Sequence, residues 1–360
     1  MTSIEKTAVL EADATHRIGA ELANFESAHL TRRKAALTLA LLGAALVVVG
    51  IAATSFGSVH ISLIRALSDS SSSDSAILYG VRIPRVLMAI VIGAVLASVG
   101  AALQALVRNP LAEGGILGIS GGGALGAILA LILASRVGAQ DVIVPVAGFA
   151  AALLSTFAVY RMALVAGRIE PFTLLLVGVI FNAFWGAAIM IINSVVNFYY
   201  AHSILFWLMG SLEAPSYREV AIIAATGVVG FVILMSRARD MNLLSLGDEA
   251  AAELGVEVDF VRRTIFVATS IMIGAAVSVS GIISFVGLIV PHMLRLAFGS
   301  DYRLLLPASI IGGAAFMVAA DLAARVIIAP AEVPVGAITA LCGGPFFIYL
   351  LRRQETRTFS

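Results

Sequence analysis

The sequence contains little charge, one cysteine and two lysines. Charged residues make up 12% of its 360 positions, about half the share of an average globular domain, whereas hydrophobic residues make up 60%. The single cysteine, Cys342, excludes an internal disulfide. A net charge of +1 gives no sign of nucleic-acid binding. This balance predicts an integral membrane protein.

The two lysines, Lys6 and Lys34, both lie near the N-terminus, and no G-x-x-x-x-G-K-[ST] loop occurs. A phosphate-binding loop of that kind needs its lysine at the phosphates. If ATP drives this protein, another chain must therefore hydrolyse it. The pattern G-x-G-x-x-G does occur at Gly121, Gly123 and Gly126, but no strand precedes it. We expect close helix packing there instead of a dinucleotide site.

Apolar runs of about 20 residues match the length that a helix needs to cross a hydrocarbon core. They predict an all-α polytopic bundle of ten transmembrane helices. The turn between the seventh and eighth spans is the least marked, because residues 278–287 include small residues and no charge. The ten expected spans are residues 36–56, 83–106, 114–134, 143–165, 172–194, 215–235, 261–281, 283–298, 304–325 and 334–351.

Ten spans place both termini on one side of the membrane. If that side is the cytoplasm, 17 of the 23 lysines and arginines lie inside, which predicts an N-in, C-in topology. The expected organisation is a flexible cytoplasmic tail over residues 1–35, a ten-helix domain over 36–353 and a cytoplasmic C-terminal tail over 354–360. The six outer basic residues would be Arg65, Arg82, Arg85, Arg136, Arg218 and Arg325.

A charged island, SLGDEAAAELGVEVD (residues 245–259), lies in the loop 237–260 between the sixth and seventh spans. Gly247 can break the preceding element, Asp248 is a candidate N-cap, and Gly255 is placed to end a short helix. A helix of two turns is marginal alone. The island is therefore either a helix that needs a partner surface or a solvated connector.

Asp321 and Arg325 lie four residues apart in the ninth span, so they can pair on one helix face. A charge inside a membrane segment is costly, and a proton-coupled carrier would use such an acid. A structural pair explains it equally well. Elsewhere, no two histidines have metal-ligand spacing, and His202 is either a metal or haem ligand in an outward loop or a member of an interfacial aromatic belt.

The chain resembles the BtuC-like (FecCD-type) permeases of type II ABC importers, which are the membrane subunits for vitamin B12, ferric siderophores and haem. The resemblance covers nearly the whole chain beyond the polar tail. It rests on RIPRVLMAIVIGAVLASVGAALQALVRNPLAEGGILGISGGGALG (82–126), FWLMGSL (206–212), LLSLGDEAAAELGV (243–256), SGIISFVGLIVPHMLRL (280–296) and ADLAARVIIAPAEVPVGAITALCGGPFFIYLLRR (320–353).

The resemblance implies that the loop between spans six and seven forms short coupling helices that dock into a cytoplasmic ATPase. Its alanines would permit close docking, and Glu249 and Glu253 would meet basic groups of the ATPase. The coupling residues are then Leu246, Gly247, Asp248, Glu249, Ala250, Ala251, Glu253, Leu254 and Gly255.

The resemblance also assigns roles outside the coupling loop. Arg82, Arg85 and Arg325 would present exposed guanidinium groups to acidic residues of a periplasmic binding protein, with Asp321 orienting Arg325. The fifth span and the segment after it would line the translocation path. The path residues are Phe181, Asn182, Asn193 and Asn197.

The implied assembly is a homodimer in the lipid of the bacterial inner membrane, with two ATPase subunits that bind ATP-Mg and a periplasmic binding protein. The chain itself is expected to be a transport subunit with no catalytic residues, metal or permanent cofactor. The segment PAEVPVGAITALCGGPFFIYLL (330–351) looks most like the haem-type permeases, so haem is the expected cargo, carried inward by alternating access. A ferric siderophore and vitamin B12 are the alternatives. An ion-coupled secondary transporter that uses Asp321 and a structural scaffold are the competing classes.

Overall fold

The computed structural model describes residues 31–134, 140–213 and 215–358. The chain divides into residues 1–38 and residues 39–360, and the account below concerns the second unit. Most of the expected N-terminal tail, residues 1–30, lies outside the described residues. The helices are α2 (Arg32–Ser55), α3 (Leu63–Ser68), α4 (Ser73–Ile77), α5 (Ile83–Leu106), α6 (Ile119–Ala134), α7 (Gln140–Met162), α8 (Pro171–Val195), α9 (Phe198–Met209), α10 (Tyr217–Ser236), α11 (Ala238–Leu244), α12 (Asp248–Glu253), α13 (Val258–Ser280), α14 (Val286–Phe298), α15 (Tyr302–Val326) and α16 (Val335–Thr358).

Four smaller elements complete the described part of the chain. A π-helical turn, η1 (Leu78–Arg82), leads directly into α5, and a 3-10 turn, η2 (Gly114–Leu117), precedes α6. Strands β1 (Leu164–Val165) and β2 (Arg168–Ile169) form a two-residue antiparallel hairpin between α7 and α8.

The all-α membrane fold predicted from the sequence is confirmed. Seven described helices are long and apolar enough to cross a membrane, and three shorter apolar helices, α6, α14 and α16, occupy the remaining predicted spans. Several boundaries differ from the prediction by a few residues. The largest differences are at α6, which begins five residues late at Ile119, and at α16, which continues to Thr358 through most of the expected C-terminal tail. The eighth span begins three residues late, at Val286.

Glycine and alanine at the helix contacts explain how the bundle packs. Gly93 of α5 faces Gly313 of α15, and Gly100 of α5 faces Gly287 of α14, with no room for a side chain at either contact. Gly126 of α6 lies against Ala147 and Ala151 of α7 in the same way. Between lipid-embedded helices, such close backbone approach supplies van der Waals contact. The G-x-G-x-x-G pattern is therefore a packing motif, as expected.

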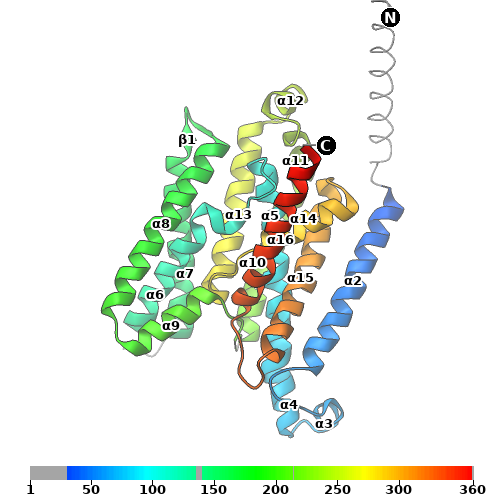
Figure 1. Cartoon of the computed structure of the whole chain (residues 1–360), viewed down its shortest axis with the longest axis vertical. Helices are drawn as coiled ribbons and strands as arrows, with labels where there is room; N and C mark the ends of the chain where they lie inside the picture. Colours follow the sequence, from blue (N-terminus) through cyan, green and yellow to red (C-terminus); the bar gives the residue numbers. More distant parts are fainter. Residues whose placement is uncertain (1–30, 135–139, 214, 359–360) are drawn as a thin grey trace, which may run out of the picture. The chain divides into compact units, whose positions relative to one another are not determined.

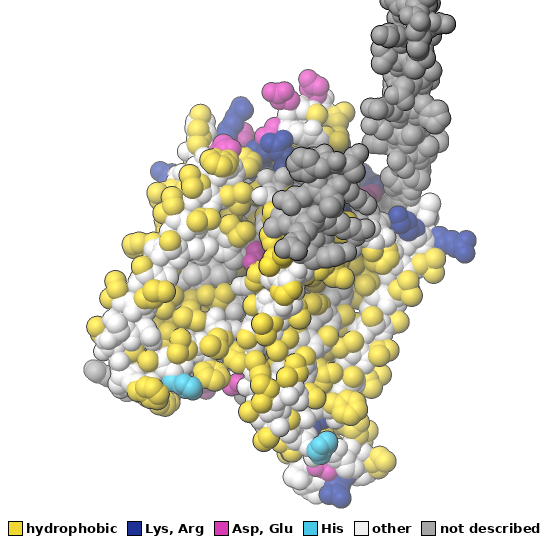
Figure 2. All heavy atoms as spheres, viewed as in Figure 1, with side chains coloured by type: hydrophobic (Ala, Val, Ile, Leu, Met, Phe, Trp, Pro, Cys, Tyr) yellow, Lys and Arg dark blue, Asp and Glu magenta, His cyan; other side chains and the backbone are white. Residues whose placement is uncertain are grey.

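The two ends of the bundle differ in the elements that they carry (Figure 1). One end, which we call the α12 end, carries α11, α12 and the β-hairpin, and the opposite end, which we call the α3 end, carries α3 and α4. Hydrophobic side chains dominate the flank between them, and acidic side chains gather over α12 (Figure 2). This distribution is typical of a chain whose flank faces lipid and whose ends face water.

Candidate functional site

The segment expected to dock into the ATPase, residues 245–256 and named the coupling segment after this expectation, contains a short helix between two glycines with positive φ. Gly247 (φ 116°) precedes α12 and Gly255 (φ 87°) follows it, as the sequence predicts. The expected N-cap is wrong, because Asp248 is the first residue of α12 and makes no cap hydrogen bond. Its carboxylate instead accepts a hydrogen bond from the Arg262 guanidinium at 2.7 Å. An ion pair to α13 has replaced the local cap.

The inner face of α12 is anchored to the bundle. Arg262 is buried on α13 and also donates to the carbonyl of Ile169 in β2, at 3.3 Å. Arg108 lies 3.9 Å from Asp248, and Ala251 is fully buried beneath the helix. These contacts provide the surface that a two-turn helix needs to stay folded. Ala251 was expected to help docking, and this expectation is wrong because its side chain packs inward.

The outer face of α12 is open. Leu246 and Leu254 expose 62% and 60% of their surface, and Glu249, Glu253 and Gly255 are exposed beside them. Gly247 and Ala250 are half-buried. Two exposed leucines flank α12 and its exposed glutamates, and the helix is anchored on its inner side. Together they form a surface suited to a partner with an apolar pocket and a basic rim.

Helix α11 lies in the loop where the resemblance implied short helices, although its residues were not assigned from the sequence, and it connects the coupling segment to α15. The Asn242 side chain donates to Asp301 at 2.9 Å and accepts from the backbone N–H of Tyr302 at 2.9 Å. Asp301 caps α15 through the backbone N–H of Arg303 at 3.0 Å. Burial raises the pKa of Asp301, but hydrogen bonds from Arg303 and Asn242 outweigh burial and hold the pKa below its ordinary value. The Asp-x-Arg sequence signals a cap, but not the partner on α11.

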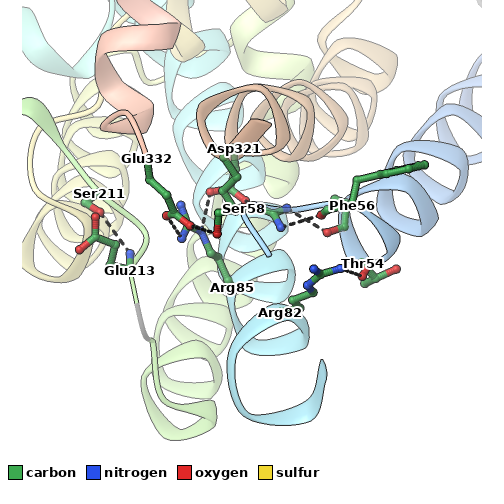
Figure 3. A network of polar contacts seen from close by, with 11 residues as sticks. Thr54, Phe56, Ser58, Arg82, Arg85, Ser211, Glu213, Asp321 and Glu332 are labelled. Atoms are coloured by element: carbon green, nitrogen blue, oxygen red, sulfur yellow. Dashed lines mark hydrogen bonds and ion pairs between the residues drawn. The ribbon is translucent and has the colours of Figure 1, made fainter. Parts of the chain in front are cut away.

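Helix α15 leads from this contact to a buried ionic cluster at the α3 end (Figure 3). Asp321 is completely buried and accepts from Arg85 at 2.8 Å and from Arg325 at 3.0 Å, one guanidinium on each carboxylate oxygen. The predicted pairing of Asp321 with Arg325 is thus confirmed. The two arginines occupy both oxygens of this carboxylate, which is the geometry of a structural anchor.

Glu332 and Ser58 extend the cluster into the loops. Glu332, between α15 and α16, accepts from Arg85 at 2.6 Å and from the hydroxyl of Ser58 at 2.8 Å. Burial raises the pKa of Glu332, but the hydrogen bonds from Arg85 and Ser58 and the charges of Arg85 and Arg325 outweigh it. The pKa of Glu332 therefore lies below its ordinary value. The cluster joins four segments of the chain.

Backbone carbonyls at the end of α2 take up the remaining guanidinium donors. Arg325 donates to the carbonyls of Ala53 and Phe56 at 2.9 and 3.0 Å. Arg82 donates to those of Thr54 and Ser55 at 2.9 and 2.7 Å, and to that of Val59. All three arginines are 6% exposed or less. The expectation of exposed guanidinium groups is therefore wrong, because internal acceptors enclose them.

The expected path residues lie along α8 and at the start of α9, and two of them have structural partners. Asn182 donates to the carbonyl of Gly115 at 2.7 Å, which holds η2, and Asn197 caps α9. Phe181 is half-buried and lies against Gly118, where a side chain would not fit. The side-chain oxygen of Asn193 is buried and has no hydrogen-bond partner among the described residues.

A cavity of about 420 Å³ lies beside α9, between the ends of α6 and α13. His202 lines it from within α9, so this histidine is in a helix and not in the expected loop. Its ring lies 4.7 Å from that of Phe206. Among the residues that the structure describes, no three His, Cys, Asp or Glu side chains are grouped to hold a metal ion.

The chain matches the FecCD transport family over residues 39–353. It belongs to this family. The permease is 44% identical to the cobalamin import permease BtuC of Halobacterium salinarum over 77% of this chain and 73% of the relative. It is 36% identical to the hemin transport permease HmuU of Yersinia pestis over 89% and 96%, and 37% identical to the iron(3+)-hydroxamate import permease FhuB of Bacillus subtilis over 78% and 72%.

A solved metal-chelate type ABC transporter in an inward-facing conformation has the same fold as this FecCD permease. The TM-score is 0.78 at 28% identity, over 88% of this chain and 99% of that one. The resemblance inferred from the sequence is confirmed. The chain is a multi-pass membrane permease subunit of a type II ABC importer, and ATP hydrolysis belongs to a separate subunit.

Proposed function

We propose that this permease imports haem by alternating access, as a homodimer with two ATPase subunits and a periplasmic binding protein. The exposed side of the coupling segment carries the proposal, because it presents Leu246, Glu249 and Leu254 while the inner face of α12 is fixed to α13. Because α12 is anchored in this way, movement of a docked ATPase would displace the transmembrane helices and not only a flexible loop. The α12 end is then cytoplasmic, with both termini inside, in agreement with the charge bias of the sequence.

Reversing one exposed charge tests the coupling role. In the complex with its ATPase, Glu249→Lys is expected to lower transport-coupled ATP hydrolysis about tenfold, because a like charge would face the basic rim of the partner. Glu213→Lys, the same change at an exposed site near the α3 end, should leave hydrolysis unchanged. Equal effects of the two substitutions would contradict the assignment of α12 as the docking helix.

The proposed cargo follows from the breadth of the match to the hemin permease, which covers 89% of this chain and 96% of that relative. Cobalamin is the second candidate, because the cobalamin permease has 44% identity over a shorter stretch. Both ligands are large metal chelates built on a macrocycle, and the aromatic and apolar side chains of α8 suit their passage better than that of a small ion. A hydroxamate siderophore is the third candidate.

Uptake into proteoliposomes separates these cargoes. The permease, its ATPase and the cognate binding protein are reconstituted, and haem, cobalamin and a ferric hydroxamate are supplied in parallel with and without ATP. We expect ATP-dependent accumulation of haem alone. Accumulation of cobalamin or the hydroxamate instead would overturn the haem proposal and leave the importer intact. Accumulation without the ATPase would favour an ion-coupled transporter.

The three arginines remain our proposed docking residues for the binding protein, with unequal roles. Arg85 and Arg325 share Asp321 and Glu332, so their charges are balanced inside the cluster. Arg82 donates only to backbone carbonyls and has no acidic partner among the described residues. Its full positive charge, just beneath the α2–α3 loop, is the one left to attract a carboxylate of the binding protein.

A further inference from the structure

A second, larger cavity opens on the flank of the bundle, away from the cluster and the coupling segment. It is a groove of about 610 Å³ between α7 and α10, and its floor is the end of α13. Both α7 and α10 pack on α13, but they hardly contact each other, so the space between them stays open. Its walls are apolar, with Val146 and Phe149 on one side and Ile222 on the other.

The groove has the depth of about one leaflet. Its lining on α7 begins at Asp141 and reaches Phe149, eight residues deeper. At 1.5 Å per residue this is about 12 Å, against about 15 Å from the edge of the hydrocarbon core to its centre. Val146 and Ile222 expose 62% and 52% of their surface. The groove therefore opens sideways toward lipid over the length of an acyl chain.

The outer end of the groove is polar and carries charges of both signs. Ser216 and Glu219 line it but are engaged in the capping box of α10, with Ser216 N–H donating to Glu219 at 2.7 Å. Asp141 and Arg218 also line it, and both are exposed. In the part of the chain that the structure describes, neither has an ion-pair partner. An anionic site and a cationic site thus stand at the mouth of one apolar groove.

We propose that this groove binds one phospholipid whose headgroup carries both a phosphate and a primary ammonium. The Arg218 guanidinium pairs with the phosphate, the Asp141 carboxylate accepts from the ammonium, and one acyl chain lies between α7 and α10. An anionic lipid without an amine satisfies only Arg218 and is repelled by Asp141. A choline lipid has no N–H to donate to Asp141. The charge pattern therefore selects an ethanolamine-type headgroup.

The position of the groove links such a lipid to the coupling segment. Helices α10 and α13 are the two long helices on either side of α11 and α12 in the chain. A lipid held against both of them would fill the space beside α7 and stiffen their packing. The lipid site does not depend on the identity of the cargo, so its test is separate from the uptake assay.

Native mass spectrometry of the delipidated full-length permease tests the proposal. Phosphatidylethanolamine, phosphatidylcholine and phosphatidylglycerol with identical acyl chains are added in equal amounts, and the tightly retained lipid is counted. We expect one retained phosphatidylethanolamine per chain, about five- to tenfold above either competitor. Asp141→Asn should abolish the preference over phosphatidylglycerol, and Arg218→Gln should lower retention of all three. Arg65→Gln, an exposed arginine on α3, is the charge control.

A steric variant separates a groove-bound lipid from ordinary boundary lipid. Val146→Trp fills the groove and should remove the retained lipid, whereas Val232→Trp, on an exposed position of α10 outside the groove lining, should not. Retention without headgroup preference, or equal retention in both tryptophan variants, would overturn the proposal. A co-purifying protein that Val146→Trp displaces would overturn it too, because the groove would then bind a helix of a partner.

Discussion

The two ends of this permease use charge in opposite ways. At the α3 end, five of the charged side chains are turned inward, and the guanidinium groups of three of them are enclosed by carboxylates and carbonyls. At the α12 end, Glu249 and Glu253 are exposed, and Asp248 between them and the preceding glycine is paired inward with Arg262. An exposed charged side chain can bind a partner protein directly. Enclosed charge mainly holds segments of the chain together.

This difference teaches that a conspicuous charge in a membrane protein can be an anchor or a contact, and that burial decides which. The α3 cluster joins α5, α15, the end of α2 and the α15–α16 loop through Asp321 and Glu332. The pair of Asp248 and Arg262 does the same for α12 on a smaller scale. Substitutions in the two regions should therefore separate loss of stability from loss of coupling.

The largest effect is expected from Asp321→Asn. It leaves Arg85 and Arg325 buried without their shared carboxylate, and unpaired buried charges of this kind cost about 3–5 kcal/mol. The free energy of unfolding should fall by that amount in a detergent-denaturant titration. Asp74→Asn is the control, because its partner Arg65 lies 3.9 Å away with a side chain that is 68% exposed. That change should cost less than about 1 kcal/mol, and equal losses would show that the cluster is not an anchor.

Arg262→Gln should have a smaller effect on stability and a clear effect on coupling. It removes the 2.7 Å pair with Asp248 and the bond to the Ile169 carbonyl, so α12 loses its fixed position on α13. We expect a loss of about 1–3 kcal/mol in unfolding free energy and a loss of ATP hydrolysis coupled to transport. The neighbouring Arg263→Gln, at an exposed position, serves as control. Unchanged coupling in Arg262→Gln would mean that α12 needs no anchor.

The sequence predicts the spans well because lipid imposes a strict requirement on length and polarity. All ten apolar runs are helices. Gly93 and Gly313 indicate close helix contacts, but the sequence alone does not show that these two glycines contact each other. The short helices α9 and α11 lack a comparable signal. Their bounds depend on tertiary contacts such as the bond from Asn242 to Asp301.

The site was harder to predict than the fold because its partners are distant or belong to the backbone. Arg325 pairs with Asp321 at the helical spacing that the sequence shows, but it also donates to carbonyls about 270 positions earlier. Every residue has a backbone carbonyl, so the sequence does not show which carbonyls accept hydrogen bonds from Arg82. Its burial could therefore not be predicted. The sequence around Asp248 is typical of an N-cap, but its carboxylate binds Arg262, 14 positions later, and does not cap the helix.

Arg82→Gln sharpens the comparison by removing the one arginine of the three expected docking arginines that has no acidic partner among the described residues. Affinity for the binding protein should fall about tenfold at low salt and less at high salt, because the attraction is electrostatic and screened. Binding is measured by biolayer interferometry on permease in nanodiscs at two ionic strengths. Arg65→Gln, a more exposed arginine at the same end, is the matched control. A larger loss from Arg65→Gln would move the docking face to α3.

The smallest effect concerns pH and follows from Glu332. Its pKa is lower in the folded chain than the ordinary value of 4.5, so its bonds to Arg85 and Ser58 stabilise the fold fully above about pH 4.5. That contribution is lost as the pH falls below 4.5 through the folded pKa. The wild-type chain should therefore be more stable than Glu332→Gln by up to about 1 kcal/mol at pH 6–7, and this difference should shrink as the pH falls below about 4.5. Thermal unfolding followed by tryptophan fluorescence measures the difference. If the stability difference between wild type and Glu332→Gln instead increased at low pH, the ionised Glu332 carboxylate would not be the group that Arg85 and Ser58 stabilise. The α3 cluster would then depend on Asp321 alone.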